Sequence, residues 1–279
     1  MMNKIEILAP VGNAENLKAA VLSGADAVYF GLGNFNARRN AQNFTFETAR
    51  EAIEYCHSRG VKVHITLNTL IKDAEITDAV ETVKAVCEMG ADAIIVQDTG
   101  LAKIIRTVCP EIEIHASTQM TVGTLEGIYE LQRLGFSRAV LPRELSYDEI
   151  KYLCEHSPID LEVFIHGALC MCVSGQCLMS AVLGSRSGNR GLCAQPCRLP
   201  FKVQKGTGHD LSLKDLSLIE HIPELSEMGV CSFKIEGRMK RPEYVSAVVS
   251  ACKKSINDSY TSLVRKDLSD LFSRSGFTD

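Results

Sequence analysis

The sequence predicts one (β/α)₈ TIM-like barrel, an α/β fold, with a long cysteine-rich loop after the seventh strand. Three observations predict it. A motif in which glycine ends a helical pattern and a buried strand follows is repeated in SGADAVYFG (23–31) and MGADAIIVQD (89–98). Eight such apolar segments alternate with amphipathic segments. The length of 279 residues also suits a barrel of this kind.

The predicted strands are short, apolar and rich in β-branched residues, as expected where both faces of a parallel sheet are covered. They span 4–9, 26–31, 62–68, 92–97, 112–117, 138–142, 161–166 and 231–236. Segments between them, such as NAENLKAAVLSG and EITDAVETVKAVCEMG, have apolar residues at helical spacing. A doubly wound open sheet is the alternative, but APVGNAEN after the first strand lacks the G-x-G-x-x-G phosphate loop.

The composition is that of a globular protein, with 46% apolar and 23% charged residues. The net charge of −4 argues against a general polyanion-binding surface, although a local basic patch is compatible with it. The N-terminus does not have the pattern of a signal peptide, and no apolar run is long enough to cross a membrane. We therefore expect a cytoplasmic protein, whose 11 cysteines are reduced rather than joined in disulfides.

Five of these cysteines lie within 28 positions, at 170, 172, 177, 193 and 197. Thiolates select zinc, copper(I) or iron–sulfur clusters. Only Cys193 and Cys197 have the close spacing of a structural zinc site, and the irregular spacing of the others better suits a cuboidal cluster held by a folded loop. Cys172 is expected to be a packing thiol, because it cannot easily share a direction with Cys170.

Two other interpretations of this region stay open. His166 precedes Cys170 by four residues and could activate it as a nucleophile, although catalytic partners usually come from distant segments. The segment 184–205 contains basic but no acidic residues, and it is either a solvated loop or a local contact for an anion. Its basic residues are Arg186, Arg190, Arg198, Lys202 and Lys205.

In a barrel of this type the functional site lies at the C-terminal ends of the strands. Polar side chains follow most of the predicted strands there, and we expect them to form a ring that binds a substrate or donor. The ring consists of Asn36, Arg38, Asn68, Gln97, His115, Gln119, Arg143, His166, Glu236 and Arg238. Polar residues are common at strand ends, so the prediction rests on the ring as a whole and singles out no catalytic residue.

Four stretches resemble the peptidase U32 family, also described as collagenase-like proteases. They are LAPVGNAENLKAAVLSGADAVYFGL, LEVFIHGALCMCVSGQCLMS, NRGLCAQPCR and FKIEGRMKRPEYV. The family includes tRNA uridine 5-hydroxylation proteins, a ribosomal RNA cytidine hydroxylase and a ubiquinone-biosynthesis hydroxylase pair. The resemblance implies a barrel with a [4Fe–4S] cluster, and by motif its ligands are Cys170, Cys177, Cys193 and Cys197.

The resemblance thus implies an iron–sulfur hydroxylase that modifies RNA, with uridine in tRNA as the first expectation and prephenate as an expected oxygen donor. A U32-type peptidase is the alternative, and a non-catalytic partner of a paralogous protein in a hydroxylase complex is a further one. Basic side chains, Lys240 and Arg241 among them, would contact RNA phosphate or a carboxylated donor. Members of the family continue into a further region, so we expect 1–257 to form the barrel and 258–279 to begin that region.

Overall fold

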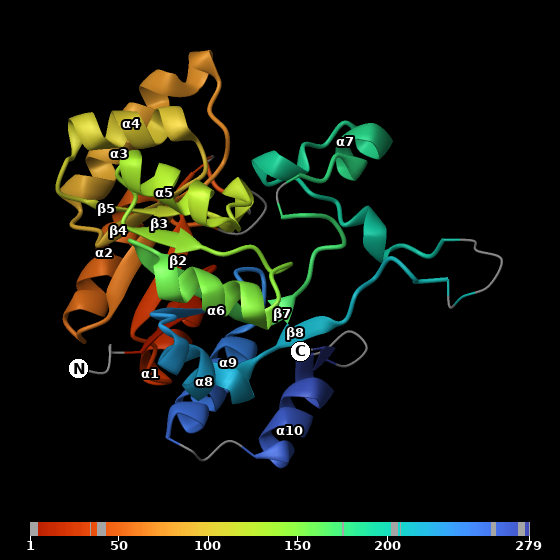
Figure 1. Cartoon of the computed structure of the whole chain (residues 1–279). Coiled ribbons are helices and arrows are strands. Elements are labelled where there is room, and N and C mark those ends of the chain that lie inside the picture. Colours follow the sequence, from red (N-terminus) through yellow and green to blue (C-terminus); the bar gives the residue numbers. More distant parts are fainter. Residues whose placement is uncertain are drawn as a thin grey trace.

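The computed structural model describes residues 5–33, 35–37, 43–174, 176–201, 206, 208–257, 261–272 and 277–278. Its centre is a parallel barrel (Figure 1). The barrel strands are β1 (Glu6–Pro10), β2 (Ala27–Gly31), β3 (Lys62–Leu67), β4 (Ala93–Val96), β5 (Glu113–Ala116), β6 (Arg138–Val140), β7 (Asp160–Ala168) and β9 (Ser232–Ile235). Because β9 pairs in parallel with both β7 and β1, the barrel is closed. The predicted fold is confirmed, and each predicted strand overlaps an observed one.

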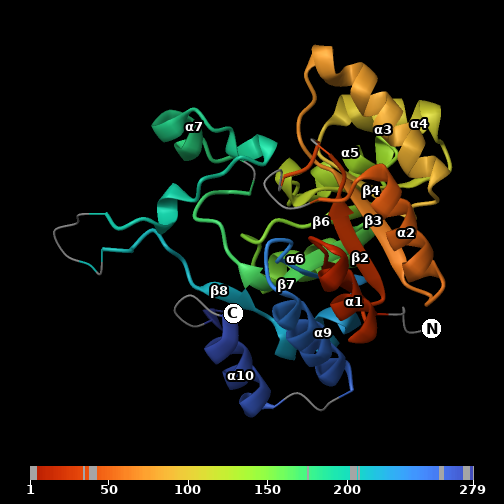
Figure 2. The same ribbon diagram turned by 180° about the vertical axis from the view of Figure 1, so that it is seen from behind.

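Helices follow most strands and cover the outside of the barrel (Figures 1 and 2). They are α1 (Ala14–Leu22), α2 (Phe46–His57), α3 (Ile76–Glu88), α4 (Thr99–Val108), α5 (Leu125–Arg133), α6 (Tyr147–His156), α8 (Ile222–Met228) and α9 (Pro242–Ile256). Local sequence starts several of them: Ser146 and Glu149 form a capping box at α6, and the side chain of Asp98 accepts the N–H of Leu101 at α4. None of the described helices has the length and apolar character needed to cross a bilayer.

Alternate residues of the strands have different surroundings. Ile7, Val63 and Ile94 pack with the helices in the main apolar core. On each strand, the residues that alternate with these outward-facing ones face the barrel axis, where a TIM barrel usually has bulky branched side chains. Here many of the inward residues are polar or charged and nevertheless buried. They are His64, His115, Arg138, Glu162 and Lys234.

The long loop predicted after the seventh strand is present, and Figures 1 and 2 show it projecting away from the barrel. It contains α7 (Met179–Gly184) and the 3₁₀ turns η3 (Gly188–Arg190) and η4 (Pro196–Arg198). The chain then returns as β8 (Asp215–Ser217), which pairs antiparallel with the end of β7 before η5 (Ile219–His221) and α8.

Two of the basic residues predicted to be solvated or to contact an anion instead hold this loop in place. Arg190 donates to the carbonyl of Leu70 at 2.5 Å and pairs with Glu75 Oε1, also at 2.5 Å. Glu75 belongs to the 3₁₀ turn η1 (Asp73–Glu75). Arg198 donates to the carbonyls of Leu169 at 2.5 Å and Leu213 at 3.0 Å. Lys202 and Lys205 lie outside the described residues.

The last described segments pack beside the loop's return strand. Helix α10 (Ser262–Phe272) contacts α9, and β10 (Phe277–Thr278) pairs with β8. The ring of Phe277 lies 5.0 Å from that of His166 on β7. The boundary at 257 and the start of a further region at 258–279 stay predictions.

Candidate functional site

A cavity of about 540 Å³ lies at the C-terminal ends of the barrel strands. Strands β2 to β7 and β9, or the turns after them, each contribute to its wall, and the cysteine-rich loop forms the remainder. Among the residues at its base are Tyr29, Ile95 and Phe164, whose side chains face the barrel axis. The cavity is therefore where a barrel of this type places its chemistry.

All four cysteines predicted as ligands line this one cavity: Cys170, Cys177, Cys193 and Cys197. Burial and the neighbouring thiols raise the pKa of Cys197, although Arg198 acts in the opposite direction. Cys172 is not among the described residues that line the cavity, and burial together with the thiols of Cys177 and Cys170 raises its pKa.

The donor set fits a group held by thiolates. Cys193 Sγ accepts the backbone N–H of Gln195 at 3.3 Å and lies 3.8 Å from the Ser180 hydroxyl, and donors of this kind accompany thiolate ligands. Gly188, in the wall, lies close enough to Cys177 and Cys193 that an added Cβ would contact both residues. Within the described part of the chain, however, no three His, Cys, Asp or Glu side chains converge to hold a single metal ion.

Half of the predicted polar ring lines the cavity: Asn68, Gln119, Arg143, Glu236 and Arg238. Asn36 and Gln97 are buried behind it. Asn36 Oδ1 accepts a hydrogen bond from Arg238 at 3.4 Å, and Gln97 Nε2 donates to the carbonyl of Gln119 at 3.4 Å. Arg38 lies outside the described residues.

The two histidines of the predicted ring do not line the cavity. His115 is fully buried in the barrel, where its Nε2 lies 3.1 Å from Glu113 and its ring packs edge-on against His64. His166 Nδ1 lies 2.9 Å from the hydroxyl of Tyr244. Burial, with a smaller contribution from Lys240, lowers the pKa of His166 to about 3, so this ring is neutral. The structure does not bring His166 into a pair with Cys170.

Arg143 and Arg238 are held rigidly in the cavity wall. Arg143 pairs with Glu236 at 3.0 Å, and its guanidinium lies 3.7 Å from the centre of the Phe164 ring. Arg238 is only 6% exposed and donates to Thr66 Oγ1 at 2.9 Å. These contacts fix two planar cationic groups in positions suited to a carboxylate or phosphate.

Sequence reasoning missed Lys234, which also lines the cavity and is 4% exposed. Its ammonium donates to Glu162 Oε1 at 2.7 Å and lies 4.5 Å from the centre of the Tyr29 ring. Burial favours the neutral acid at Glu162, but Lys234 and Arg138 outweigh it and hold the pKa of Glu162 at about 2. Burial lowers the pKa of Lys234, and Glu162 opposes that effect. The sequence does contain a signal for this pair, because Lys234 and Glu162 are charged residues inside the otherwise apolar strands SFKIEG and LEVFIHG.

The described lining carries more positive than negative charge. Its cationic side chains are those of Arg143, Arg198, Lys234, Arg238 and Lys240, and its carboxylate is that of Glu236. Such an excess around a partly enclosed cavity favours an anionic ligand.

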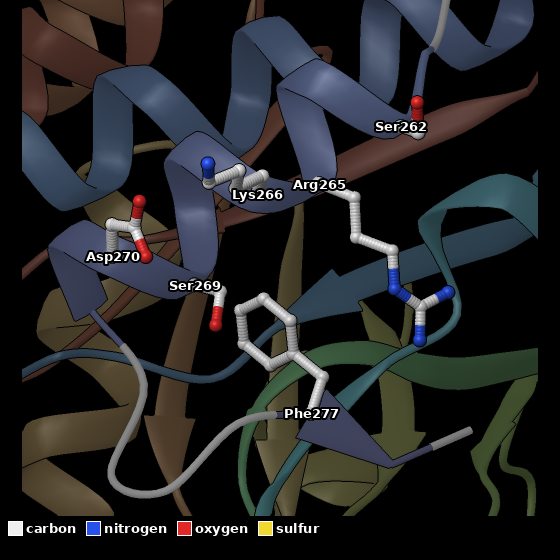
Figure 3. A pocket seen from close by; sticks show the side chains of 6 residues that line it. All are labelled: Ser262, Arg265, Lys266, Ser269, Asp270 and Phe277. Atoms are coloured by element: carbon white, nitrogen blue, oxygen red, sulfur yellow. The ribbon is translucent and has the colours of Figure 1, made fainter.

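A smaller pocket of about 310 Å³ lies between α10 and β10. Figure 3 shows its side chains, which include Lys266, Asp270 and Phe277. Its Arg265 pairs with Glu220. None of its described lining residues is a cysteine or lies at the end of a barrel strand, so the larger cavity is the candidate site.

Comparison with known proteins supports a single family. The sequence profile of Peptidase family U32 matches residues 12–278. The chain is 39% identical to tRNA hydroxylation protein P1 of Bacillus subtilis, over 91% of this chain and 63% of that protein. It is 40% identical to 23S rRNA 5-hydroxycytidine C2501 synthase of Escherichia coli, over 89% of this chain and 38% of that protein. It is 37% identical to a protein named Collagenase from Porphyromonas gingivalis, over 91% of this chain and 66% of that protein.

The chain therefore spans less than two thirds of the length of these relatives. Among solved structures, the U32 peptidase Mk0906 superimposes with a TM-score of 0.60 at 13% identity, over 84% of this chain and 94% of that one. This likeness agrees with the barrel. The resemblance noted in the sequence is confirmed, and the chain belongs to peptidase family U32.

Proposed function

We propose that this protein is an RNA-modifying hydroxylase that carries a [4Fe–4S] cluster on Cys170, Cys177, Cys193 and Cys197. The observation that carries the proposal is the single cavity, in which these four thiols meet the polar ends of the barrel strands. The names of two relatives, a tRNA hydroxylation protein and a 5-hydroxycytidine synthase, support hydroxylation of RNA.

Each part of the cavity has a role in this proposal. A bound cluster would supply electron transfer at the rim. Arg143, Lys234 and Arg238 would bind an anionic oxygen donor of the prephenate type, because guanidinium groups recognise carboxylates and the cavity has excess positive charge. A volume of about 540 Å³ is within the usual range for small-molecule sites and can admit a flipped nucleobase.

RNA would approach from the open side of the cavity. Arg186 and Arg241 are exposed and Lys240 lines the cavity, so these cations would contact phosphates while the base enters. Uridine in tRNA is the proposed target, and the name of the Bacillus subtilis relative, a tRNA hydroxylation protein, supports tRNA as the RNA. A paralogous protein partner stays a prediction.

The peptidase alternative rests on the family name and on the relative named Collagenase. A cysteine or serine peptidase needs a base beside its nucleophile. Histidine is the most common base in such enzymes, and no histidine is found among the described residues that line the cavity. The geometry therefore favours the hydroxylase. Gelatin cleavage that persists after Cys170→Ala and Cys193→Ala would revive the peptidase.

The proposal is tested by mass spectrometry of nucleosides from a strain that lacks the gene. We expect 5-hydroxyuridine derivatives in tRNA to disappear and to return with the wild-type gene. Complementation should fail with Cys193→Ser and succeed with Cys172→Ser, a matched change of a thiol outside the cavity lining. Unchanged tRNA nucleosides, with no paralogue to compensate, would overturn the proposal.

A further inference from the structure

The four thiols of the cavity differ in what surrounds them, and Cys193 has two hydrogen-bond donors directed at its sulfur. The backbone N–H of Gln195 lies 3.3 Å from Cys193 Sγ, and Ser180 Oγ lies 3.8 Å from it. Both distances suit donors to sulfur, whose radius is larger than that of oxygen. One donor is a main-chain group and the other is a side chain that can be changed.

The surroundings of Ser180 orient its hydroxyl toward the sulfur. The side chain is 4% exposed, at the start of α7. Its oxygen accepts the backbone N–H of Ala194 at 3.1 Å, which uses one of its lone pairs. A hydroxyl has a single proton to donate, and the Ser180 hydroxyl donates it to Cys193 Sγ. Ser180 thus ties α7 to the segment that carries Cys193.

The backbone conformation around Gln195 fixes the second donor. Gln195 adopts a left-handed conformation with φ 56° and ψ 46°, and Pro196 follows it. A non-glycine residue rarely adopts this conformation unless surrounding contacts hold it there. The turn directs the Gln195 N–H back to the sulfur two residues earlier.

We infer that Ser180 sets the electron density on Cys193 and thereby raises the reduction potential of the group that Cys193 holds. This inference rests on the proposed cluster. Hydrogen bonds to ligand sulfurs stabilise the more negative, reduced state, and they are one of the means by which proteins adjust iron–sulfur potentials. Ser180 is therefore a positioning residue, which acts through Cys193 rather than on the substrate.

The test compares the wild-type chain with Ser180→Ala, each purified without oxygen. We expect equal iron and sulfide content, and a midpoint potential, followed by electron paramagnetic resonance, that falls by about 59 mV. That shift corresponds to a tenfold change in a one-electron equilibrium. Ser187→Ala is the matched control, because it removes a hydroxyl from the same loop at a residue whose side chain caps no helix. Its potential should equal that of the wild type.

Each result has a defined meaning. A fully loaded Ser180→Ala protein with an unchanged potential would overturn the inference and leave the proposed function intact. A wild-type chain that binds no iron would overturn the cluster itself. If Ser180→Ala fails to load, Ser180→Thr decides, since it keeps the hydroxyl: loading restored by threonine supports the hydrogen bond, and loading lost in both variants contradicts it.

Discussion

The buried charges inside the barrel give the sharpest prediction about stability. Glu162 is fully buried and its carboxylate accepts from Lys234 at 2.7 Å, Ser232 at 3.0 Å and Arg138 at 3.3 Å. The substitution Glu162→Gln keeps the size of the side chain but removes its charge. Lys234 then loses its carboxylate partner, whereas Arg138 keeps Glu6 at 2.6 Å.

The pKa of Glu162 and the general cost of breaking a buried ion pair give the order of magnitude of the effect, and the burial that lowers the pKa of Lys234 acts against it. A pKa of about 2, against an ordinary value near 4.5, corresponds to roughly 3 kcal/mol in favour of the folded carboxylate. Removing one partner of a buried ion pair costs about 3 to 5 kcal/mol. Because the folded pKa of Glu162 is the lower one, this stabilisation is complete above its ordinary pKa, and it is lost as the pH falls from about 4.5 toward 2.

The assay is urea denaturation of both proteins with matched iron content. At pH 7 we expect Glu162→Gln to lose about 3 kcal/mol of unfolding free energy, and the difference should shrink toward pH 3. Glu81→Gln is the control: Glu81 is 66% exposed and pairs with Lys84 on the surface of α3, so it should lose less than about 1 kcal/mol. A second measurement adds Lys234→Met, which should lower the unfolding free energy by less in the Glu162→Gln protein than in the wild type. A loss below about 1 kcal/mol for Glu162→Gln, or no coupling, would refute the reasoning.

Three further predictions concern the cavity, the loop and a buried histidine. Replacing Arg238 with methionine removes a cation from the cavity wall but no ligand thiol. The iron content should therefore stay constant, while the amount of hydroxylated nucleoside falls by about tenfold or more. An amount equal to that formed by the wild type would contradict the role of Arg238 in binding the donor. Arg190→Met breaks the contact between the cysteine-rich loop and η1, so limited proteolysis should cleave within 170–200 faster than in the wild type. The unfolding free energy should change little, because the ion pair with Glu75 is partly exposed. As the control, Arg133→Met on α5 should leave the digestion pattern unchanged. The pKa of about 3 predicts that His166 stays neutral in the folded protein from pH 8 to about 5. Because this pKa lies below the ordinary value of 6.5, burial of the neutral ring contributes to the unfolding free energy above pH 6.5, and that contribution is lost as the pH falls toward 3. A midpoint above pH 5 in the titration of its NMR signals would contradict this.

The barrel was predictable because its signals are local. Strands such as 26–31 and 92–97 follow a glycine that ends a helix, and this punctuation is visible within ten residues. The cysteine loop was predictable for the same reason, since its thiols are close in sequence. The short strands β8 and β10 were not, because each has only two or three residues and depends on a distant partner.

The contents of the barrel depend on which strand residues face inward, and this required the structure. Lys234 could be read as a lysine that projects from a strand into solvent, but closure of the barrel directs it toward Glu162, 72 residues away. Arg190 likewise meets Glu75 across 115 residues of sequence. His166 satisfied the rule for strand-end residues, yet Tyr244 and Phe277 surround it from the C-terminal part of the chain.

The central claim is that the thiol-lined cavity hydroxylates RNA, and reconstitution tests it most directly. The chain, purified without oxygen and shown to carry about four iron atoms, would be incubated with prephenate and tRNA from the strain that lacks the gene. We predict that mass spectrometry finds uridine heavier by one oxygen atom, with the wild-type and Cys172→Ser proteins but not with Cys193→Ser. A fully loaded protein that leaves every nucleoside of this RNA unchanged would contradict the claim.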